Sequence, residues 1–357
     1  TLDSITVSDC TLDPAFNSAT TEYSCTVKNN ISSVTVNATA TSSKSKVRGL
    51  GAKELAVGVN TLPIRVIAED GSEKIYNVNV TRKGGVTSLK NEIMKNKIIT
   101  AEPTLTTSSN NTSDVSGLYK STDTNTGEPT YYFRGNVENN YVSFAGQTWR
   151  IVRINEDGTI RIVMQDGIND NATYAFNSNY NNYTYMYYTN SEAKTTLESW
   201  YQTNIGSKSD LAQNAASGAY YCEQAKVKYG DDGTSGSATM TTDNKYTPDF
   251  KCATDGNGKG QVNASVGLLT YDEVVYAGGY PYQNNSNYYL YNNTTFWTMS
   301  PAGATIGGSF VWYVYNLGSV GSFYSGQSHN LRPVVNLKQD IQISSGDGTK
   351  ENLFVVE

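Results

Sequence analysis

The amino-acid sequence predicts a mainly β protein with some α-helix (α+β), in which an N-terminal β-sandwich precedes a larger domain of mixed structure. Short runs of alternating apolar and polar residues, separated by turn residues, fill residues 1–83. Such runs are typical of half-buried strands. Thr, Ser, Asn and Tyr are abundant, whereas only 8 Pro and 1 His occur, a usage typical of β-rich extracellular proteins. A length of 357 residues favours two or three domains.

Charge and hydropathy argue against two classes of partner. A net charge of −6 and a pI near 5.0 disfavour nucleic acid, because binding to its phosphates requires a basic surface. No run of about 20 apolar residues is present, so we expect no membrane insertion. No signal peptide begins the chain at Thr1, and we therefore expect a soluble, mature or trimmed ectodomain.

The four cysteines fall into two local pairs, Cys10 with Cys25 and Cys222 with Cys252, 15 and 30 residues apart. A zinc site would need closely spaced cysteines together with histidines, and neither is present. Two local disulfides are the simplest interpretation, and they would place the chain in an oxidising, extracellular compartment. The alternative is four buried free thiols.

Residues 1–83 contain a series of short predicted strands. The strands are expected at Leu2–Val7, Glu22–Val27, Val34–Ala40, Glu54–Val57, Leu62–Glu69 and Lys74–Thr81. Asp70-Gly71 between the last two is a strong hairpin signal. In the final strand Ile75, Asn77 and Asn79 face one way and Tyr76, Val78 and Val80 the other. About seven short strands in about eighty residues form a β-sandwich.

The same segment resembles a known module. The stretches that carry the resemblance are Leu2–Ser8, Leu12–Phe16, Thr21–Ser24, Val57–Ile64 and Ala68–Tyr76. They are similar to the cadherin-like β-sandwich module of bacterial surface proteins. The resemblance implies a spacer or stalk without the calcium motifs of true cadherins, in which Cys10 and Cys25 would join the first strands.

Residues 84–116 are predicted to be a linker with one short helix. Gly84-Gly85 leaves the backbone flexible. Apolar residues at helical spacing predict a helix from Thr87 to Lys97, with Ser88 as its N-cap. The polar stretch Thr104–Asp114 is expected to be a loop.

Residues 117–357 are predicted to form the second domain. Two β-branched runs flank Asn155–Gly158 and predict a hairpin. A helix is expected over Thr195–Tyr201, capped near Ser191. Gly230–Gly260 is rich in Gly, Asp and Thr, and we expect a long loop that a Cys222–Cys252 disulfide would close.

Four stretches of residues 117–350 are the most specific, namely Phe144–Ile151, Gly267–Gly279, Trp297–Pro301 and Leu331–Leu337. With them the segment resembles a broad family of bacterial and phage surface proteins with a C-type-lectin-like fold. Some members, such as the phage major tropism determinant, are diversified by retroelements. The resemblance implies that the surface presented between the Ser-Pro and Arg-Pro landmarks varies, here Ala302–Asn330. Between Ala304 and Asn330 only Trp312 and Gln327 are residues that such adenine mutagenesis hardly reaches, which fits diversification.

A charge-free run overlaps this window. From Val274 to Leu331, 58 residues contain no Asp, Glu, Lys or Arg, although 17% of the chain is charged and about ten would be expected. The run contains 14 aromatic residues, 9 of them Tyr, among Gly, Ser, Asn and Thr. That composition is typical of antibody contact surfaces, where rigid rings supply area at low entropic cost. We interpret the run as a recognition surface.

Strand periodicity assigns residues of the window to two faces. Trp312, Val314, Asn316 and Gly318 are expected to face the scaffold. The residues predicted to contact a ligand are Thr305, Ile306, Ser309, Tyr313, Tyr315, Leu317, Ser319, Phe323, Tyr324, Gln327, Ser328 and His329. The alternative is that alternating aromatics form the core of a sheet. The Tyr-rich stretch Tyr180–Tyr188 is either an exposed loop or, as we favour, a wall packed against the site.

The sequence lacks the residues of common catalytic and metal sites. His329 is the only histidine and is expected to be a surface contact rather than a base, so a histidine-based triad or zinc protease is not supported. Asp-rich loops at Asp231 and Asp255 lack the spacing and closing Glu of a calcium loop. The Glu-Pro-Asn and Trp-Asn-Asp ligand sets of calcium-dependent lectins are absent. We therefore expect no enzyme activity, no cofactor and no metal.

The sequence thus predicts an extracellular ligand-binding protein, an adhesin or receptor-binding protein on a bacterial cell surface, a phage or an appendage. Its partner would be a protein or glycan on another cell or surface. One alternative is a structural subunit of a surface filament, in which the neutral surface packs against a further copy of the chain. A second alternative is a carbohydrate-active enzyme, which would require two suitably spaced carboxylates.

Overall fold

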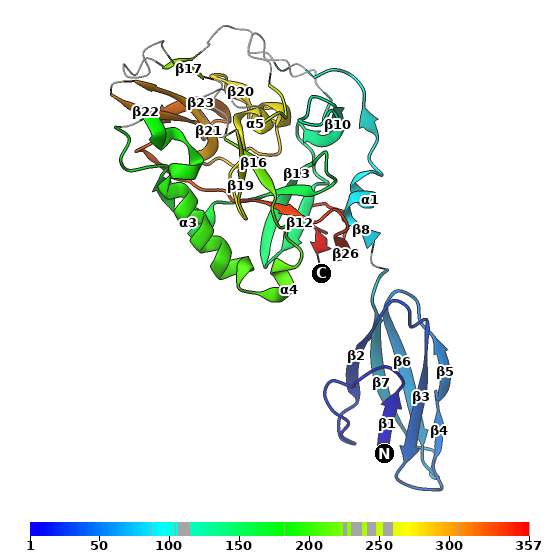
Figure 1. The fold of residues 1–357 in the computed structure, drawn as a ribbon. Coiled ribbons are helices and arrows are strands. Elements are labelled where there is room, and N and C mark those ends of the chain that lie inside the picture. The colour runs from blue at the N-terminus through cyan, green and yellow to red at the C-terminus, as the bar shows by residue number, and fades with distance from the viewer. Residues whose placement is uncertain are drawn as a thin grey trace. The chain divides into compact units, whose positions relative to one another are not determined.

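The computed structural model divides into two units, Thr1–Thr87 and Ser88–Glu357. It describes residues 1–85, 87–103, 105, 115–181, 183–223, 227–229, 238–240, 248–252, 260–305 and 307–356. Strands dominate both units, in agreement with the predicted mainly β, α+β class (Figure 1).

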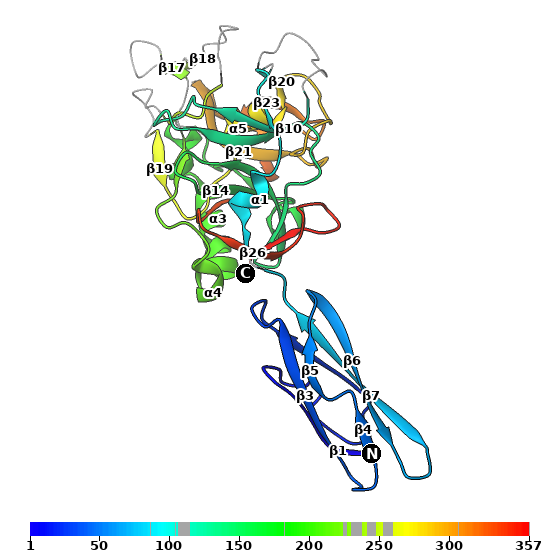
Figure 2. The same ribbon diagram turned by 90° about the vertical axis from the view of Figure 1, so that its right-hand side faces the viewer.

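The first unit is a sandwich of two sheets (Figure 2). One sheet has the order β1-β3-β5 and the other β2-β7-β6-β4. The strands are β1 Leu2–Val7, β2 Glu22–Val27, β3 Ser33–Ala40, β4 Lys46–Arg48, β5 Gly51–Glu54, β6 Gly58–Ile67 and β7 Glu73–Arg82. Tyr76, Val78 and Val80 are buried, as the alternation predicts. The unit therefore follows the period-two pattern closely, because one face of each strand lines a shared core.

In the sandwich, the predicted hairpin and the predicted disulfide are confirmed, and one predicted strand is wrong. β6 and β7 form the predicted hairpin, and Asp70 Oδ1 in its turn accepts a hydrogen bond from Ser72 N at 2.9 Å. The Cys10–Cys25 disulfide is present. The predicted strand Glu54–Val57 is wrong, because β5 ends at Glu54. Asn60 holds the backbone of Ala56 in a turn, accepting from Ala56 N at 2.9 Å and donating to Ala56 O at 2.8 Å.

The second unit is built around a ten-stranded sheet. Its main path is β8-β26-β27-β12-β13-β11-β10-β9, and β14 joins β13 to β25. The strands are β8 Thr87–Ser88, β9 Ile98–Ile99, β10 Gly117–Ser121, β11 Thr130–Arg134, β12 Tyr141–Phe144, β13 Gln147–Ile154, β14 Ile160–Met164, β25 Val334–Leu337, β26 Gln342–Ser345 and β27 Phe354–Val356. β13 and β14 form the predicted hairpin.

A six-stranded sheet carries the charge-free run. Its order is β15-β24-β21-β22-β23-β20. The strands are β15 Thr173–Ala175, β20 Tyr280–Pro281, β21 Phe296–Thr305, β22 Gly308–Val314, β23 Ser319–Tyr324 and β24 Ser328–Asn330. Two short pairs complete the described strands: β16 Tyr220–Cys222 with β19 Gln261–Asn263, and β17 Val227–Tyr229 with β18 Ala238–Met240.

The described helices are short. They are α1 Leu89–Ile93, α2 Ile168–Asn171, η1 Tyr183–Met186, η2 Tyr188–Asn190, α3 Glu192–Tyr201, η3 Gln202–Gly206, α4 Ser209–Ala212 and α5 Tyr271–Ala277. The predicted helix Thr195–Tyr201 lies within α3, and Ser191 is its cap because Ser191 Oγ accepts from Lys194 N at 3.0 Å. The Cys222–Cys252 disulfide is present, and most of the predicted loop Gly230–Gly260 lies outside the described residues.

The linker predicted over residues 84–116 is shorter in the structure. Residues from Ser88 onward belong to the second unit, since Leu89 and Ile93 of α1 are buried in its core and Leu89 N donates to Ile341 O at 3.0 Å. Ser88 occupies the predicted N-cap position, although its side chain makes no capping hydrogen bond, and the helix runs from Leu89 to Ile93 rather than from Thr87 to Lys97. Apart from Leu105, the predicted loop Thr104–Asp114 lies outside the described residues.

We expect Ile93→Ala to destabilise the second unit, because it removes a fully packed side chain from that unit's core. Comparable substitutions lower the free energy of unfolding by about 2–5 kcal/mol. All four tryptophans lie in the second unit, so urea unfolding followed by tryptophan fluorescence reports on it alone. Asn91→Ala, an exposed position on the same helix, is the control. Equal unfolding midpoints for the two variants would contradict the placement of α1 in this core.

Candidate binding surface

The aromatic residues of the charge-free run divide between core and surface. Six of the 14 are buried, namely Tyr276, Tyr280, Tyr288, Tyr289, Phe296 and Trp297. Four are half-buried, namely Tyr291, Phe310, Trp312 and Tyr313. Four are exposed: Tyr282 (66%), Tyr315 (42%), Phe323 (41%) and Tyr324 (37%). Some aromatic residues of the run therefore form core, as one interpretation predicts, and others form surface, as the other predicts.

The β22–β23 hairpin brings most of the exposed rings together. Its strands pair Val311 with Phe323 and Tyr313 with Gly321. The Tyr313 ring contacts Tyr315 and Phe323 edge-to-face, with centroids 6.3 and 6.2 Å apart. The absence of a side chain at Gly321 leaves room for the Tyr313 ring, since a Cβ there would lie 3.2 Å from Tyr313 Cε1. Edge-to-face contacts of this kind stabilise the arrangement.

The structure places most of the predicted contact residues on or near the surface. Tyr315, Leu317, Phe323, Tyr324, Gln327 and Ser328 are exposed, and Tyr313, Ser319 and His329 are half-buried. Thr305 ends β21, and its side chain lies outside the described part of the chain, as does all of Ile306. These residues come from β21, β22, β23, β24 and the turns between them.

Ser309 does not belong to the surface. It lies at the start of β22, fully buried, and its Oγ shares a hydrogen bond of 2.8 Å with Ser325 Oγ. Ser309 N also donates to Tyr180 O at 2.8 Å. The prediction of an exposed loop was wrong, because the strand begins one residue earlier and the segment around Tyr180 covers it.

The prediction that Trp312, Val314, Asn316 and Gly318 face the scaffold applies only to residues within strand β22. Val314 and Gly318 are buried and Trp312 is half-buried, but Asn316 is exposed. β22 ends at Val314, and the next residues form a turn in which Tyr315 N donates to Ser319 O and Gly318 N to Tyr315 O, both at 2.8 Å. Alternation of faces applies only to extended backbone, so the assignment of Asn316 was wrong.

His329 supports the surface rather than forming a free contact. Its ring lies between Trp297 and Tyr313, with centroids 4.5 and 5.1 Å away, and it stacks on Tyr313 at an interplanar angle of 15°. Burial lowers the pKa of His329 from 6.5 to about 4. The imidazole is therefore neutral at pH 7, so it adds no charge to the surface.

The Tyr-rich stretch combines the two predicted alternatives. Met186, Tyr187 and Tyr188 are buried in the core of the second unit, and Tyr188 OH donates to Val266 O at 2.9 Å. Tyr180 is instead exposed and contacts the Tyr324 ring, with centroids 5.8 Å apart. In the sequence, only the position of Tyr180 in a run of tyrosines could have indicated it as a surface residue. Its contact with Tyr324 joins residues more than a hundred positions apart.

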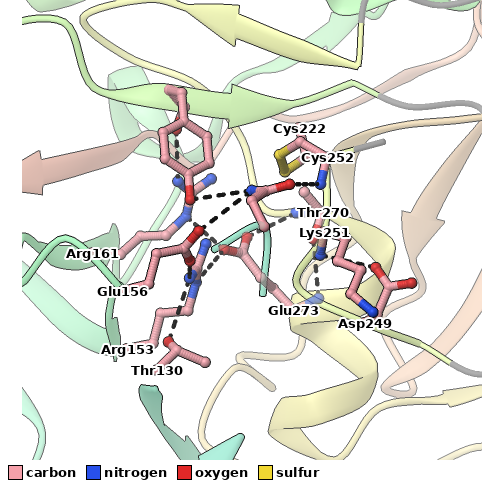
Figure 3. Close-up of a disulfide and its surroundings, with 12 residues drawn as sticks. Thr130, Arg153, Glu156, Arg161, Cys222, Asp249, Lys251, Cys252, Thr270 and Glu273 are labelled. Atoms are coloured by element: carbon pink, nitrogen blue, oxygen red, sulfur yellow. Dashed lines mark hydrogen bonds and ion pairs between the residues drawn. A yellow bond between two sulfur atoms is a disulfide. The ribbon is translucent and has the colours of Figure 1, made fainter. Parts of the chain in front are cut away.

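Buried charged residues flank both ends of the charge-free run. At its start, Glu273 lies in α5 and its Oε1 meets Arg153 Nε at 3.2 Å and Arg161 Nε at 2.6 Å, all with side chains at most 3% exposed (Figure 3). Its Oε2 accepts from Thr270 N at 3.0 Å and completes a capping box. One carboxylate thus pairs with two arginines and caps a helix.

At the end of the run, Arg332 is buried. Its Nε donates to Met164 O at 3.0 Å and its Nη1 to Leu290 O at 2.7 Å, while its guanidinium lies over the Phe296 ring. Burial lowers the pKa of Arg332 to about 10, so it remains protonated at pH 7. These hydrogen bonds tie the segment after the run to β14 and to the segment before β21.

The second disulfide borders the ionic cluster. Cys252 N donates to Asn125 Oδ1 at 2.7 Å, and Asn125 Nδ2 donates to Glu156 Oε1 and to Tyr220 OH, each at 3.4 Å (Figure 3). Glu156 Oε2 lies 3.9 Å from Arg153 Nη1. The side chains of Glu156 and Glu273 are thus both buried and both lie near an arginine.

The first unit belongs to the class of two-sheet β-sandwiches. Residues 2–83 match the family model of the cadherin-like beta sandwich domain, as the sequence predicted. No curated protein and no solved structure shows detectable similarity to the chain. None of the helices in the described ranges is long and apolar enough to cross a membrane. Among the described residues, no group of three or more His, Cys, Asp or Glu is placed to hold a metal ion.

We expect Glu273→Gln to destabilise the second unit strongly. Gln can still cap α5, but Arg153 and Arg161 lose their shared counter-charge in a buried site. Removing one partner from a buried ion pair destabilises a protein by about 3–5 kcal/mol. Glu69→Gln removes an exposed partner of Lys44 and should change stability by less than about 1 kcal/mol. Urea unfolding followed by tryptophan fluorescence measures the first variant, and thermal unfolding followed by circular dichroism measures the second. A Glu273→Gln variant as stable as the native chain would contradict the role of the cluster.

Proposed function

We propose that the chain is an extracellular ligand-binding protein, an adhesin or receptor-binding protein of a bacterial cell surface, a phage or an appendage. The cadherin-like sandwich would act as a spacer, and the second unit, C-type-lectin-like in fold, would carry the binding surface. The observation that supports this most is the group of exposed, uncharged rings on the β22–β23 hairpin.

The arrangement of landmarks supports the C-type-lectin-like assignment. Trp297 and Arg332, from the stretches that carry the resemblance, are buried, and Trp297 Nε1 donates to Tyr174 O at 3.0 Å. The window Ala302–Asn330 between them contains the exposed hairpin. A fixed frame with an exposed insert is the arrangement that retroelement diversification of this window would require.

The chemistry of the surface suits equilibrium recognition. Large rings bury much area on contact, and Tyr hydroxyls with neighbouring Ser, Asn and Gln side chains supply hydrogen bonds that fix orientation. A surface without formal charge gains little from long-range attraction, so association would depend weakly on salt. The proposal includes no catalytic step, because Glu156 and Glu273 are buried and lie against arginines.

We expect Tyr315→Ala combined with Phe323→Ala to lower ligand affinity at least tenfold, since exposed rings of this kind are typical hot spots contributing about 1–2 kcal/mol each. Arrays of glycans and of surface proteins, probed with the native chain and the variant, measure the effect. Val59→Ala, which removes an exposed apolar side chain from the first unit, is the control. The dissociation constant of a bound partner should change less than about threefold between low and high salt.

Two results would count against the proposal. Binding that the double substitution leaves intact would place the contact surface elsewhere. Concentration-dependent self-association in sedimentation velocity, lost in the same variant, would favour the structural subunit of a filament, with a further copy of the chain as the partner.

A further inference from the structure

The exposed rings continue beyond the window of residues 302–330. Five rings contact one another in sequence, and we name them the ring row. In order of contact they are Tyr315, Tyr313, Phe323, Tyr324 and Tyr180. Successive ring centroids are 6.3, 6.2, 6.1 and 5.8 Å apart. Tyr180 comes from a different part of the chain and is 38% exposed. The row is thus assembled from two segments.

The backbone around Tyr180 is fixed to the hairpin. Tyr180 O accepts from Ser309 N at 2.8 Å, and Asn177 N donates to Ser325 O at 2.9 Å. The Tyr180 ring lies against two glycines, because a Cβ at Gly326 would be 2.4 Å from Tyr180 Cδ1 and one at Gly308 would be 2.7 Å from Tyr180 Cδ2. Such support holds the ring in one position before any partner arrives, which reduces the entropy lost on binding.

The orientation of the rings indicates which kind of partner fits. Successive interplanar angles along the row are 89°, 83°, 87° and 55°. A sugar chain stacks on ring faces that lie in one plane, and rings turned edge-to-face provide no such strip. Leu317, 48% exposed in the turn that follows Tyr315, adds an apolar side chain that has no hydrogen-bonding group. An uneven apolar surface of this kind is complementary in shape to the apolar side chains of a protein partner.

The lack of charged residues on the hairpin further restricts the class of partner that fits. The hairpin lies within the charge-free run, and His329 behind Tyr313 is neutral at pH 7. A charged group of a partner would lose its hydration at the hairpin without gaining an opposite charge from it. At the Tyr180 end the exposed Glu192 accepts hydrogen bonds from Ser178 N and Ser178 Oγ, so it is the side chains contacting the hairpin that we expect to be uncharged.

We propose that Tyr180 is the fixed end of a docking surface, the ring row with Leu317, whose occupant is a protein that presents uncharged, apolar side chains. This inference rests on the proposed function and adds to it a contact residue outside the window and the class of partner.

The test uses binding proteins selected without choosing their epitope. A naive yeast-displayed library of fibronectin type III scaffolds is selected against the full chain, and independent clones are titrated against variants. Most clones should lose affinity at least tenfold, about 1.4 kcal/mol, on Phe323→Ala, on Tyr180→Ala and on Gly326→Ala. Gly326→Ala keeps Tyr180 but displaces its ring. Val59→Ala should change nothing, and urea unfolding by tryptophan fluorescence checks that each variant folds.

The outcomes separate the inference from the proposed function. Clones that lose affinity on Phe323→Ala but not on Tyr180→Ala and Gly326→Ala would overturn the inference and leave the proposed function standing. A selection that gives no clone sensitive to any of the three would overturn both. Binding to an array of uncharged oligosaccharides that Tyr180→Ala abolishes would overturn the assignment of a protein partner.

Discussion

The second unit depends on how two buried charges are satisfied at the ends of a long neutral segment. A charge removed from water is tolerated only when hydrogen bonds and opposite charges replace its hydration. Glu273 meets this requirement with two arginines and a helix N-terminus, whereas Arg332 meets it in part, with two backbone carbonyls and the face of the Phe296 ring, while its Nη2 has no hydrogen-bond partner among the described residues. Because these contacts fix the chain on either side, the 58 residues between them need no charged side chain to hold their place.

That fixed frame explains how one aromatic-rich segment provides both core and surface. Tyr288, Tyr289 and Trp297 are buried next to the frame, where their area stabilises the fold. The β22–β23 hairpin then carries Tyr315 and Phe323 into solvent, supported from behind by the stacked rings of Tyr313 and His329. Exposed apolar rings held in fixed positions lower the entropic cost of a contact, which is the property that a recognition surface requires.

Local signals allowed much of this to be predicted from the sequence. Alternation, Asp-Gly turns and the Ser191 cap act over a few residues, so the sandwich, both hairpins and α3 were predictable. Features that depend on distant residues were not. The burial of Ile93, the position of Tyr180 against Tyr324 and the Arg153–Glu273 pair join segments that no sequence pattern connects. Ser309 and Asn316 were misassigned because alternation cannot show where a strand begins or ends.

Four rings of the ring row, Tyr315, Phe323, Tyr324 and Tyr180, lie open to solvent, whereas neighbouring aromatics of the charge-free run are buried in the core. Hydroxyl-radical footprinting of the native full chain, resolved by mass spectrometry at single residues, tests this difference in exposure most directly. We expect rapid oxidation of Tyr315, Phe323, Tyr324 and Tyr180, and strong protection of Tyr288, Tyr289 and Trp297. Protection of these four rings to the same degree as the buried set, in a monomeric sample, would contradict their exposure.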